Sequence, residues 1–305
     1  MTIDTGGAVV ADGEVATQRV RLSRAAVDRL AAVAAVASPA DQLLTCTPAP
    51  PGAGRLGGAP VTPPAEATVD DVLERAGLLA AGAPTAAARA VLTTWHAPSL
   101  AVDLEVLVDL ARGRARVRSH HRCLGDRVAC LSTADGASLE LAWSPVGRWR
   151  AELARAAHVD LDTLRTAPAF EPTPDVVETP WDLLLATGEA VRAGRPDLVD
   201  RMVTDHPATT LAGHRPDLLD DAGLDDVRRW HEQLESTSRG RLHAALTGRG
   251  SRGGVAGVVE WVLLPDGWCS LTPVIRDGWE MVRLQRVGPR DLPRALARLA
   301  AGLAA

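Results

Sequence analysis

Two stretches of this chain each predict four β-strands joined by very short turns. The predicted strands cover residues 99–110, 114–123, 127–134 and 138–143 in the first stretch, and residues 239–247, 255–264, 268–275 and 279–287 in the second. Apolar residues alternate or cluster within each segment, and Asp-Gly pairs such as Asp135-Gly136 and Asp277-Gly278 separate several of them. Turns this short can join only antiparallel neighbours. We therefore expect two antiparallel meanders.

The elements around the two meanders follow the same order. A predicted helix ending near a Trp-His pair precedes each meander, at Trp95-His96 and at Trp230-His231, and a helix opened by Pro145 or Pro289 follows it. The offset is on the order of 140 residues throughout, which is typical of an internal repeat. Because few residues are identical between the halves, two unrelated meanders that look alike remain the alternative.

The repeat suggests a domain organisation of two α+β halves within one compact domain. We expect a disordered N-terminus over 1–16, a first half over 17–165, a linker over 166–179 and a second half over 180–305. A Pro- and Gly-rich loop is expected over 46–67, because its composition does not support regular structure. Helices are predicted near residues 23–36, 84–95, 145–157, 196–205, 216–235 and 289–303, and two further helices are predicted to begin near residues 68 and 180.

Charge and residue usage restrict the classes of partner. The net charge of -5 argues against a nucleic-acid-binding protein, which needs a concentrated basic face. All 33 basic residues are arginine, and lysine, asparagine and tyrosine are absent, a pattern typical of a very GC-rich genome such as that of an actinobacterium. The scarcity of aromatic residues therefore carries no functional meaning.

Nothing in the chain predicts a membrane span or a secretory leader. There is no basic segment followed by an apolar core at the N-terminus, and no run of eighteen apolar residues. The four cysteines have neither the spacing of a disulfide framework nor that of a zinc site. We expect a cytoplasmic protein with reduced thiols.

Three patterns that can signal chemistry have simpler explanations here. The segment 248–253 matches GxGxxG, but a strand follows it where a dinucleotide site needs a helix, which favours a hairpin loop. His120 and His121 are adjacent, so on a strand they point to opposite faces and cannot jointly hold a metal. His231-Glu232 lacks the second histidine of HExxH. We therefore predict no catalytic, cofactor or metal site, and no enzymatic activity.

Tryptophan is the one abundant aromatic residue, with eight copies against one phenylalanine. Trp261, Trp268 and Trp279 lie on the C-terminal strands, and Trp268 and Trp279 directly follow predicted turns. Tryptophan is prominent both in protein cores and at binding hot spots. The three residues are candidate anchors for a partner, with packing in the core as the alternative.

The C-terminal stretch 261–303 resembles the end of proteins of the EspG family of ESX (type VII) secretion. It contains a Trp-bearing strand, a DG turn, a further strand pair and a Pro-started helix; the stretch 100–157, a meander followed by a helix, is similar too. The resemblance implies an α+β fold with a central, mostly antiparallel sheet, two helical subdomains and a quasi-twofold relation between halves.

The resemblance also implies a function. EspG proteins are cytosolic chaperones that bind the hydrophobic helical tip of PPE proteins in PE–PPE pairs, through the sheet face, a loop between early strands and the C-terminal helices. The matching loop here is 111–114, which is shorter than the loop of mycobacterial members. Because the family's loop contacts the partner, Arg112 and Arg114 of this loop are candidate contacts. Arg249 and Arg252 of the Gly-rich loop are further candidates. Self-association without cargo is also expected to be possible. An enzyme or a small-molecule sensor with a cleft between the halves is the alternative.

Overall fold

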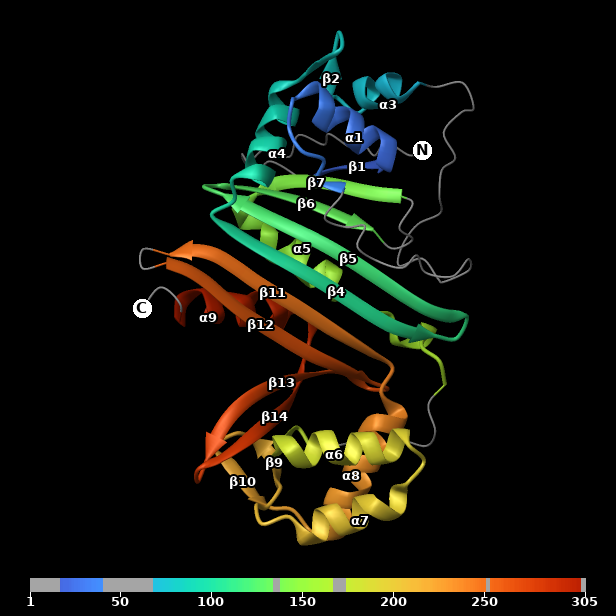
Figure 1. Cartoon of the computed structure of the whole chain (residues 1–305), viewed down its shortest axis with the longest axis vertical. Helices are drawn as coiled ribbons and strands as arrows, with labels where there is room; N and C mark the ends of the chain where they lie inside the picture. The colour runs from blue at the N-terminus through green and yellow to red at the C-terminus, as the bar shows by residue number, and fades with distance from the viewer. Residues whose placement is uncertain (1–16, 41–67, 134–137, 167–173, 251–252, 303–305) are drawn as a thin grey trace.

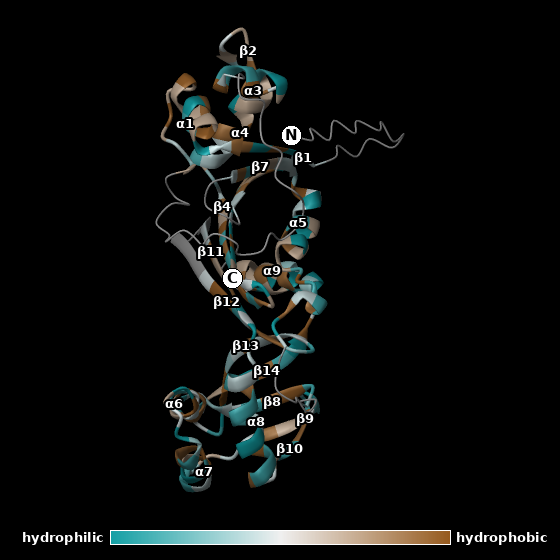
Figure 2. Ribbon diagram, turned by 90° about the vertical axis from the view of Figure 1, so that its right-hand side faces the viewer, coloured by the Kyte–Doolittle hydropathy of each residue, from teal (hydrophilic) through white to brown (hydrophobic). Residues whose placement is uncertain are grey.

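The computed structural model describes residues 17–40, 68–133, 138–166, 174–250 and 253–302. The expectations for 1–16 and 46–67 therefore lie outside the described residues. The fold is α+β: the main strands form one large antiparallel sheet with helices on both of its faces (Figures 1 and 2). The predicted fold class is confirmed.

All eight predicted meander strands are present. They are β4 (Leu100–Leu110), β5 (Gly113–Leu124), β6 (Arg127–Thr133), β7 (Ser138–Pro145), β11 (Gly240–Gly250), β12 (Gly253–Leu264), β13 (Gly267–Arg276) and β14 (Trp279–Val287). The other strands of the sheet are β1 (Gln18–Ser23), β8 (Val176–Pro180), β9 (Leu211–Arg215) and β10 (Leu218–Asp221), while β2 (Leu79–Ala80) and β3 (Ala83–Pro84) form a separate pair.

The order of the strands mirrors the two halves of the chain. The sheet runs β1-β7-β6-β5-β4-β11-β12-β13-β14-β8-β9-β10, so the two meanders meet where β4 pairs with β11. β1 lies beyond the first meander and β8 beyond the second, in corresponding positions. This symmetric order is the arrangement expected of a quasi-twofold repeat.

The helices form three groups. The described helices are α1 (Arg24–Val33), α3 (Val69–Arg75), α4 (Ala86–His96), α5 (Trp149–Ala156), α6 (Trp181–Arg192), α7 (Pro196–Asp205), α8 (Leu224–Thr237) and α9 (Leu292–Gly302), with 3-10 turns at Val146–Arg148, Leu161–Thr163 and Pro289–Asp291. The first group is α1, α3 and α4, which pack on β1, β6 and β7. The second is α6, α7 and α8, near β13 and β14. α5 and α9 cover the middle of the sheet from its other side (Figure 2).

Helix starts follow local hydrogen bonding. Ser23 and Thr85 cap α1 and α4 by accepting bonds from Ala26 and Ala88, and the capping box predicted from Thr68 and Asp71 is present at α3. Each cap satisfies backbone donors that a helix start leaves without a partner.

Two segments were predicted wrongly. The expected linker 166–179 contains most of β8, a fully buried strand that pairs with β14 and β9. The predicted helix 216–235 contains β10 instead in its first part, and α8 begins only at Leu224. Pro216 suggested a helix start, but Gly223 caps the helix and Asp225 and Asp226 occupy its first turn, where carboxylates favour the helix dipole.

Candidate protein-binding face

The central strands have one buried and one accessible face. Along β4, Val102, Leu104 and Val106 are buried in the core beneath α5 and α9, whereas Asp103 and Glu105 point the other way and are partly exposed. We call the side of β5, β4, β11 and β12 turned away from α5 and α9 the open face. In Figure 2, α5 and α9 lie on one side of the sheet, and α1, α4, α6 and α7 lie on the other side towards its two ends. The open face is thus flanked by the two helical subdomains.

Strand register places charged side chains of the open face in a cross-strand row. Arg118 of β5 is opposite Glu105 of β4, which is opposite His243 of β11, which is opposite Glu260 of β12. Residues paired in this way on one face have neighbouring side chains. The row therefore alternates basic and acidic groups across four strands.

The groups in this row are held by ion pairs and a polar contact. Arg118 Nε donates to a carboxylate oxygen of Glu105 at 2.7 Å, and Arg116 Nη2 approaches the same oxygen at 2.8 Å. His243 Nδ1 lies 3.1 Å from a carboxylate oxygen of Glu260, and both side chains are about half exposed. Each acidic group on this part of the open face therefore has a basic neighbour.

A second cluster lies closer to α4. Asp103 accepts a hydrogen bond from Arg122 at 2.6 Å and lies 2.6 Å from Nδ1 of His120, while the Arg122 guanidinium is 5.1 Å from the ring centre of Trp95. Partial burial of Asp103 opposes its ionisation, but the hydrogen bond with His120 and the charge of Arg122 outweigh it and lower the pKa to about 2. Asp103 is ionised throughout the neutral range.

This arrangement suits polar contact with another protein. The half-exposed His243–Glu260 contact is worth little to stability, on the order of 0 to 1 kcal/mol, so a partner can exchange it for its own contacts at small cost. Alternating charge also allows a partner to be selected by complementary charges. Val258, which is 51% exposed, adds an apolar position beside the row.

The structure rearranges the tryptophan candidates. Trp261 and Trp268 are only 2% and 4% exposed and belong to the core under α5 and α9, where Trp268 Nε1 donates to the carbonyl of Ala157 at 2.9 Å. The prediction that Trp261 and Trp268 are anchors for a partner is therefore wrong, because both rings are packed in the core. Trp279 is 41% exposed and lies edge-on to His206, with ring centres 5.8 Å apart. It remains a candidate anchor.

The arginine candidates lie at opposite ends of the central strands. Arg112 lies in the β4–β5 turn, and Arg114, two residues later in β5, pairs with Asp109. Arg249 lies at the other end of the central strands, in β11. Along the strand direction it is about a dozen residues from the β4–β5 turn, which is on the order of 40 Å at roughly 3.4 Å per residue. Arg252 lies outside the described residues. The structure therefore does not bring Arg249 together with Arg112 and Arg114.

The Gly-rich segment forms a hairpin, as predicted. Gly248 and Gly250 end β11, Gly253 begins β12, and Gly250 pairs with Gly253. A strand rather than a helix follows the segment, so no helix N-terminus faces a phosphate position there.

The buried histidines have structural surroundings. His121 contacts Ser119 at 2.9 Å beneath α5, and burial lowers its pKa to about 3. His231 of α8 lies 2.8 Å from Thr187 and 3.2 Å from Thr179, and burial lowers its pKa to about 4. In the described part of the chain, no group of three or more potential metal ligands occurs.

The charged row was missed at the level of sequence, although a signal for it was present. Basic residues occur at every second position from Arg114 to Arg122 through Arg116, Arg118 and His120. In a strand this period places all of them on one face. The signal marks a charged sheet face, although the partner strands can be assigned only from the fold.

The sequence matches no protein-family model and no curated protein. Its structure is similar to that of the Mycobacterium tuberculosis type VII secretion system chaperone EspG5, solved in complex with a PE25–PPE41 dimer. The similarity covers 94% of this chain and 97% of that chain, with a TM-score of 0.55 and 11% sequence identity. In the described residues, no helix has the length and apolar character needed to cross a membrane. The chain thus shares the α+β fold of this secretion chaperone.

Proposed function

We propose that this protein is a cytoplasmic, non-enzymatic chaperone that binds a PPE-like protein of a PE–PPE pair and keeps it soluble for an ESX (type VII) secretion system. The observation that carries the proposal is the open face, flanked by two helical subdomains, within a fold shared with EspG5. EspG5 was solved together with a PE–PPE dimer, which gives the class of partner to test first.

The open face supports this role through its chemistry. A helical partner with an apolar tip and polar flanks needs a broad surface with charged positions and a few apolar contacts, and no cofactor. Arg118, Glu105, His243 and Glu260 supply the charged positions, and Val258 supplies an apolar one. In this role, Trp279 and the arginines Arg112, Arg114, Arg249 and Arg252 are peripheral contacts, each open to test by substitution.

The proposal is tested by co-expressing the full chain with PE–PPE pairs encoded in its own genome. Size-exclusion chromatography with light scattering then measures the mass of the species formed. A stable complex containing one copy of each protein supports the chaperone role. If every pair runs separately from the chain, or if the chain instead binds a small metabolite tightly, the chaperone role is contradicted and a ligand-binding role takes its place.

A further inference from the structure

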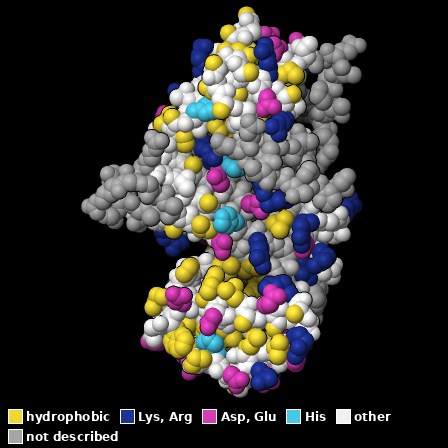
Figure 3. Space-filling model, viewed as in Figure 1, with side chains coloured by type: hydrophobic (Ala, Val, Ile, Leu, Met, Phe, Trp, Pro, Cys, Tyr) yellow, Lys and Arg dark blue, Asp and Glu magenta, His cyan; other side chains and the backbone are white. Residues whose placement is uncertain are grey.

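β12 has a pairing partner on one side only over half of its length. It pairs with β11 from Gly253 to Leu263, but with β13 only from Glu260 to Leu264. Residues 253–259 therefore have no neighbouring strand on the β13 side among the described residues. Figure 1 shows the β11–β12 and β13–β14 hairpins diverging from this point, and Figure 3 shows an indentation of the molecular outline between them.

The register shows which backbone groups face this gap. The carbonyl of Leu263 accepts a hydrogen bond from Arg239 on the β11 side, so the odd-numbered residues of β12 direct their backbone groups towards β11. The even-numbered residues Glu260 and Val262 direct theirs towards β13. Further along the same side, the backbone N–H and C=O groups of Gly254, Ala256 and Val258 face no strand of the described chain.

β13 leaves β12 at a proline. By the same register, residues 271 and 273 of β13 direct their backbone groups towards β12, and residue 273 is Pro273, which has no N–H to donate. Proline on a strand edge prevents further pairing there. The β13 side of the gap is therefore blocked, whereas the β12 side has no proline.

The corresponding strand of the first half provides a comparison. β5 also extends past its neighbour, since within the described ranges β6 pairs with it only from Arg118 to Leu124. On the extension of β5, the residues whose backbone groups face the free side are Arg114 and Arg116, and their side chains pair with Asp109 and Glu105 of β4. Charged side chains on an edge strand are a usual protection of a free edge. The residues of β12 at 253–259 are glycine, alanine and valine only. Of the two matching edges, one is protected by charge and the other is not.

We infer that the free edge of β12, residues 253–259, is a docking site for one extended segment of a partner polypeptide, which adds to the sheet as an antiparallel strand. This mode of recognition uses backbone hydrogen bonds for affinity. The inference stands independently of the PE–PPE partner proposed above, because it rests on the register and surroundings of the β12 edge.

The register also limits the occupant. β13 already fills the position opposite Glu260, so an added strand can span at most the seven positions 253–259. In a second copy pairing β12 with β12 about Ala256, Gly253 of one copy would lie opposite Val259 of the other, so the end of one β11–β12 hairpin would meet the β13 strand that begins opposite Glu260. A single extended segment meets no such obstacle.

The surroundings of the edge indicate the chemistry of the segment. On the α9 side, Gly257 lies beneath Leu299, so a side chain added opposite this position meets an apolar surface. On the open face, the neighbours are the exposed Val258 and the carboxylate of Glu260. The segment should therefore be free of proline, with small or β-branched apolar side chains towards α9 and polar or basic ones towards the open face.

A synthetic peptide of alternating threonine and valine, seven residues long with a lysine at each end, is the probe. Two N-methylated versions serve as matched reagents: one carries methyl groups on the amides that face β12, the other on the amides that face away. Binding to the full chain is measured by calorimetry, and exchange of the Ala256 and Val258 amides by NMR. We expect a 1:1 complex, slowed exchange of both amides, and at least tenfold weaker binding only for the peptide methylated on the β12 side.

Substitution of the protein gives the complementary control. Ala256→Pro removes a backbone N–H that faces the gap and leaves the N–H groups that pair with β11 in place. It should weaken peptide binding at least tenfold. Gly254→Pro removes another N–H on the same side and is used if Ala256→Pro fails to fold. Absence of binding at millimolar peptide, equal binding of both methylated peptides, or slow exchange of the two amides in the free chain would each overturn the inference. Protection that grows with protein concentration alone would assign the edge to a second copy instead.

Discussion

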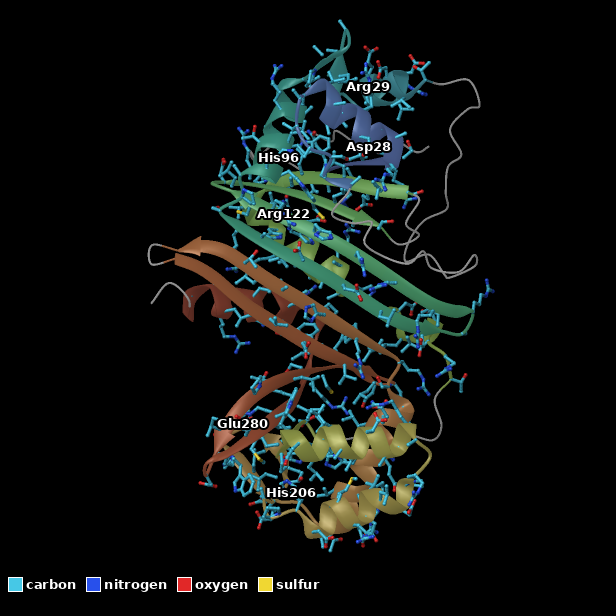
Figure 4. All side chains as sticks on the ribbon, viewed as in Figure 1. Asp28, Arg29, His96, Arg122, His206 and Glu280 are labelled. Carbon is cyan, nitrogen blue, oxygen red and sulfur yellow. The ribbon has the colours of Figure 1, made fainter. Side chains whose placement is uncertain are left out.

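His243 Nδ1 lies 3.1 Å from a carboxylate oxygen of Glu260, and the strand register places Glu105 opposite the same histidine on its other side. By register, His243 therefore lies between two glutamate positions on the open face, and its imidazole contacts the carboxylate of Glu260. Figure 4 labels Arg122, which lies near the α4 end of this face.

His243→Glu places a third carboxylate in this row. The side chains are half exposed, so the repulsion should cost the folded chain only about 1 kcal/mol. Chemical denaturation of the variant and of the parent chain measures the difference. A loss several times larger would show that the row is needed for folding, and the variant could then not be used to test binding.

Trp268→Phe removes the indole N–H that donates to the carbonyl of Ala157 within the core. Loss of a buried hydrogen bond should destabilise the chain by about 1 to 3 kcal/mol, because the carbonyl keeps its desolvation without a donor. Urea unfolding followed by tryptophan fluorescence checks this. Trp279→Phe, at an exposed ring, is the matched control and should change stability by less than about 0.5 kcal/mol. Equal losses for the two variants would contradict the assignment of Trp268 to the core.

Glu178→Gln tests a buried ion-pair cluster at the β8–β14 pairing. The carboxylate is fully buried and accepts from Arg276 Nε at 2.6 Å and from Arg283 Nε at 2.7 Å. Replacing it with a neutral amide leaves two arginines without their counter-charge, which should cost roughly 3 kcal/mol. Glu280→Gln, on the exposed start of β14, is the control. An unchanged free energy of unfolding for Glu178→Gln would contradict the view that the two arginines need the charge of this carboxylate.

The stability of the chain should fall on acidification through the pKa range of His231. Burial lowers its folded pKa to about 4 from an unfolded value of 6.5, so the unfolded chain binds more protons between these values. Stability is therefore highest above pH 6.5 and falls by about 3 kcal/mol as the pH drops to about 4. His121, with a pKa lowered to about 3, adds in the same direction.

His231→Gln keeps a polar group near Thr187 and removes the titration. Its unfolding free energy should vary less between pH 4 and 6.5 than that of the parent chain, whatever its stability at pH 7. His214→Gln, which removes a highly exposed histidine, is the control. An unchanged slope for His231→Gln would mean that this histidine is already protonated in the folded chain.

The meanders were predictable because their period-two pattern and Asp-Gly turns are local signals. β8 was not, because Val176–Pro180 is a short segment within Pro-rich sequence, and its strand conformation depends on β14, about a hundred residues later. The same limit applied to the tryptophans: Trp261 and Trp268 occupy positions that are exposed or buried according to where α5 and α9 pack, which no local pattern reports. The basic residues of β5 could have been placed on one face from their period of two alone. Their continuation through Glu105 to His243 could not, because it depends on the pairing of β4 with β11 between the two halves.

The most direct test of the account compares charge reversal on the two sides of the sheet. The double variant Arg118→Glu with His243→Glu alters the open face, and Arg294→Glu alters α9 on the opposite side, where Arg294 is exposed. The affinity of each variant for a PE–PPE pair that binds the parent chain is measured by calorimetry at two salt concentrations. The account predicts at least a tenfold loss for the open-face variant, a smaller salt dependence of what remains, and no loss for Arg294→Glu. Unchanged affinity of the open-face variant, or a loss confined to Arg294→Glu, would contradict it.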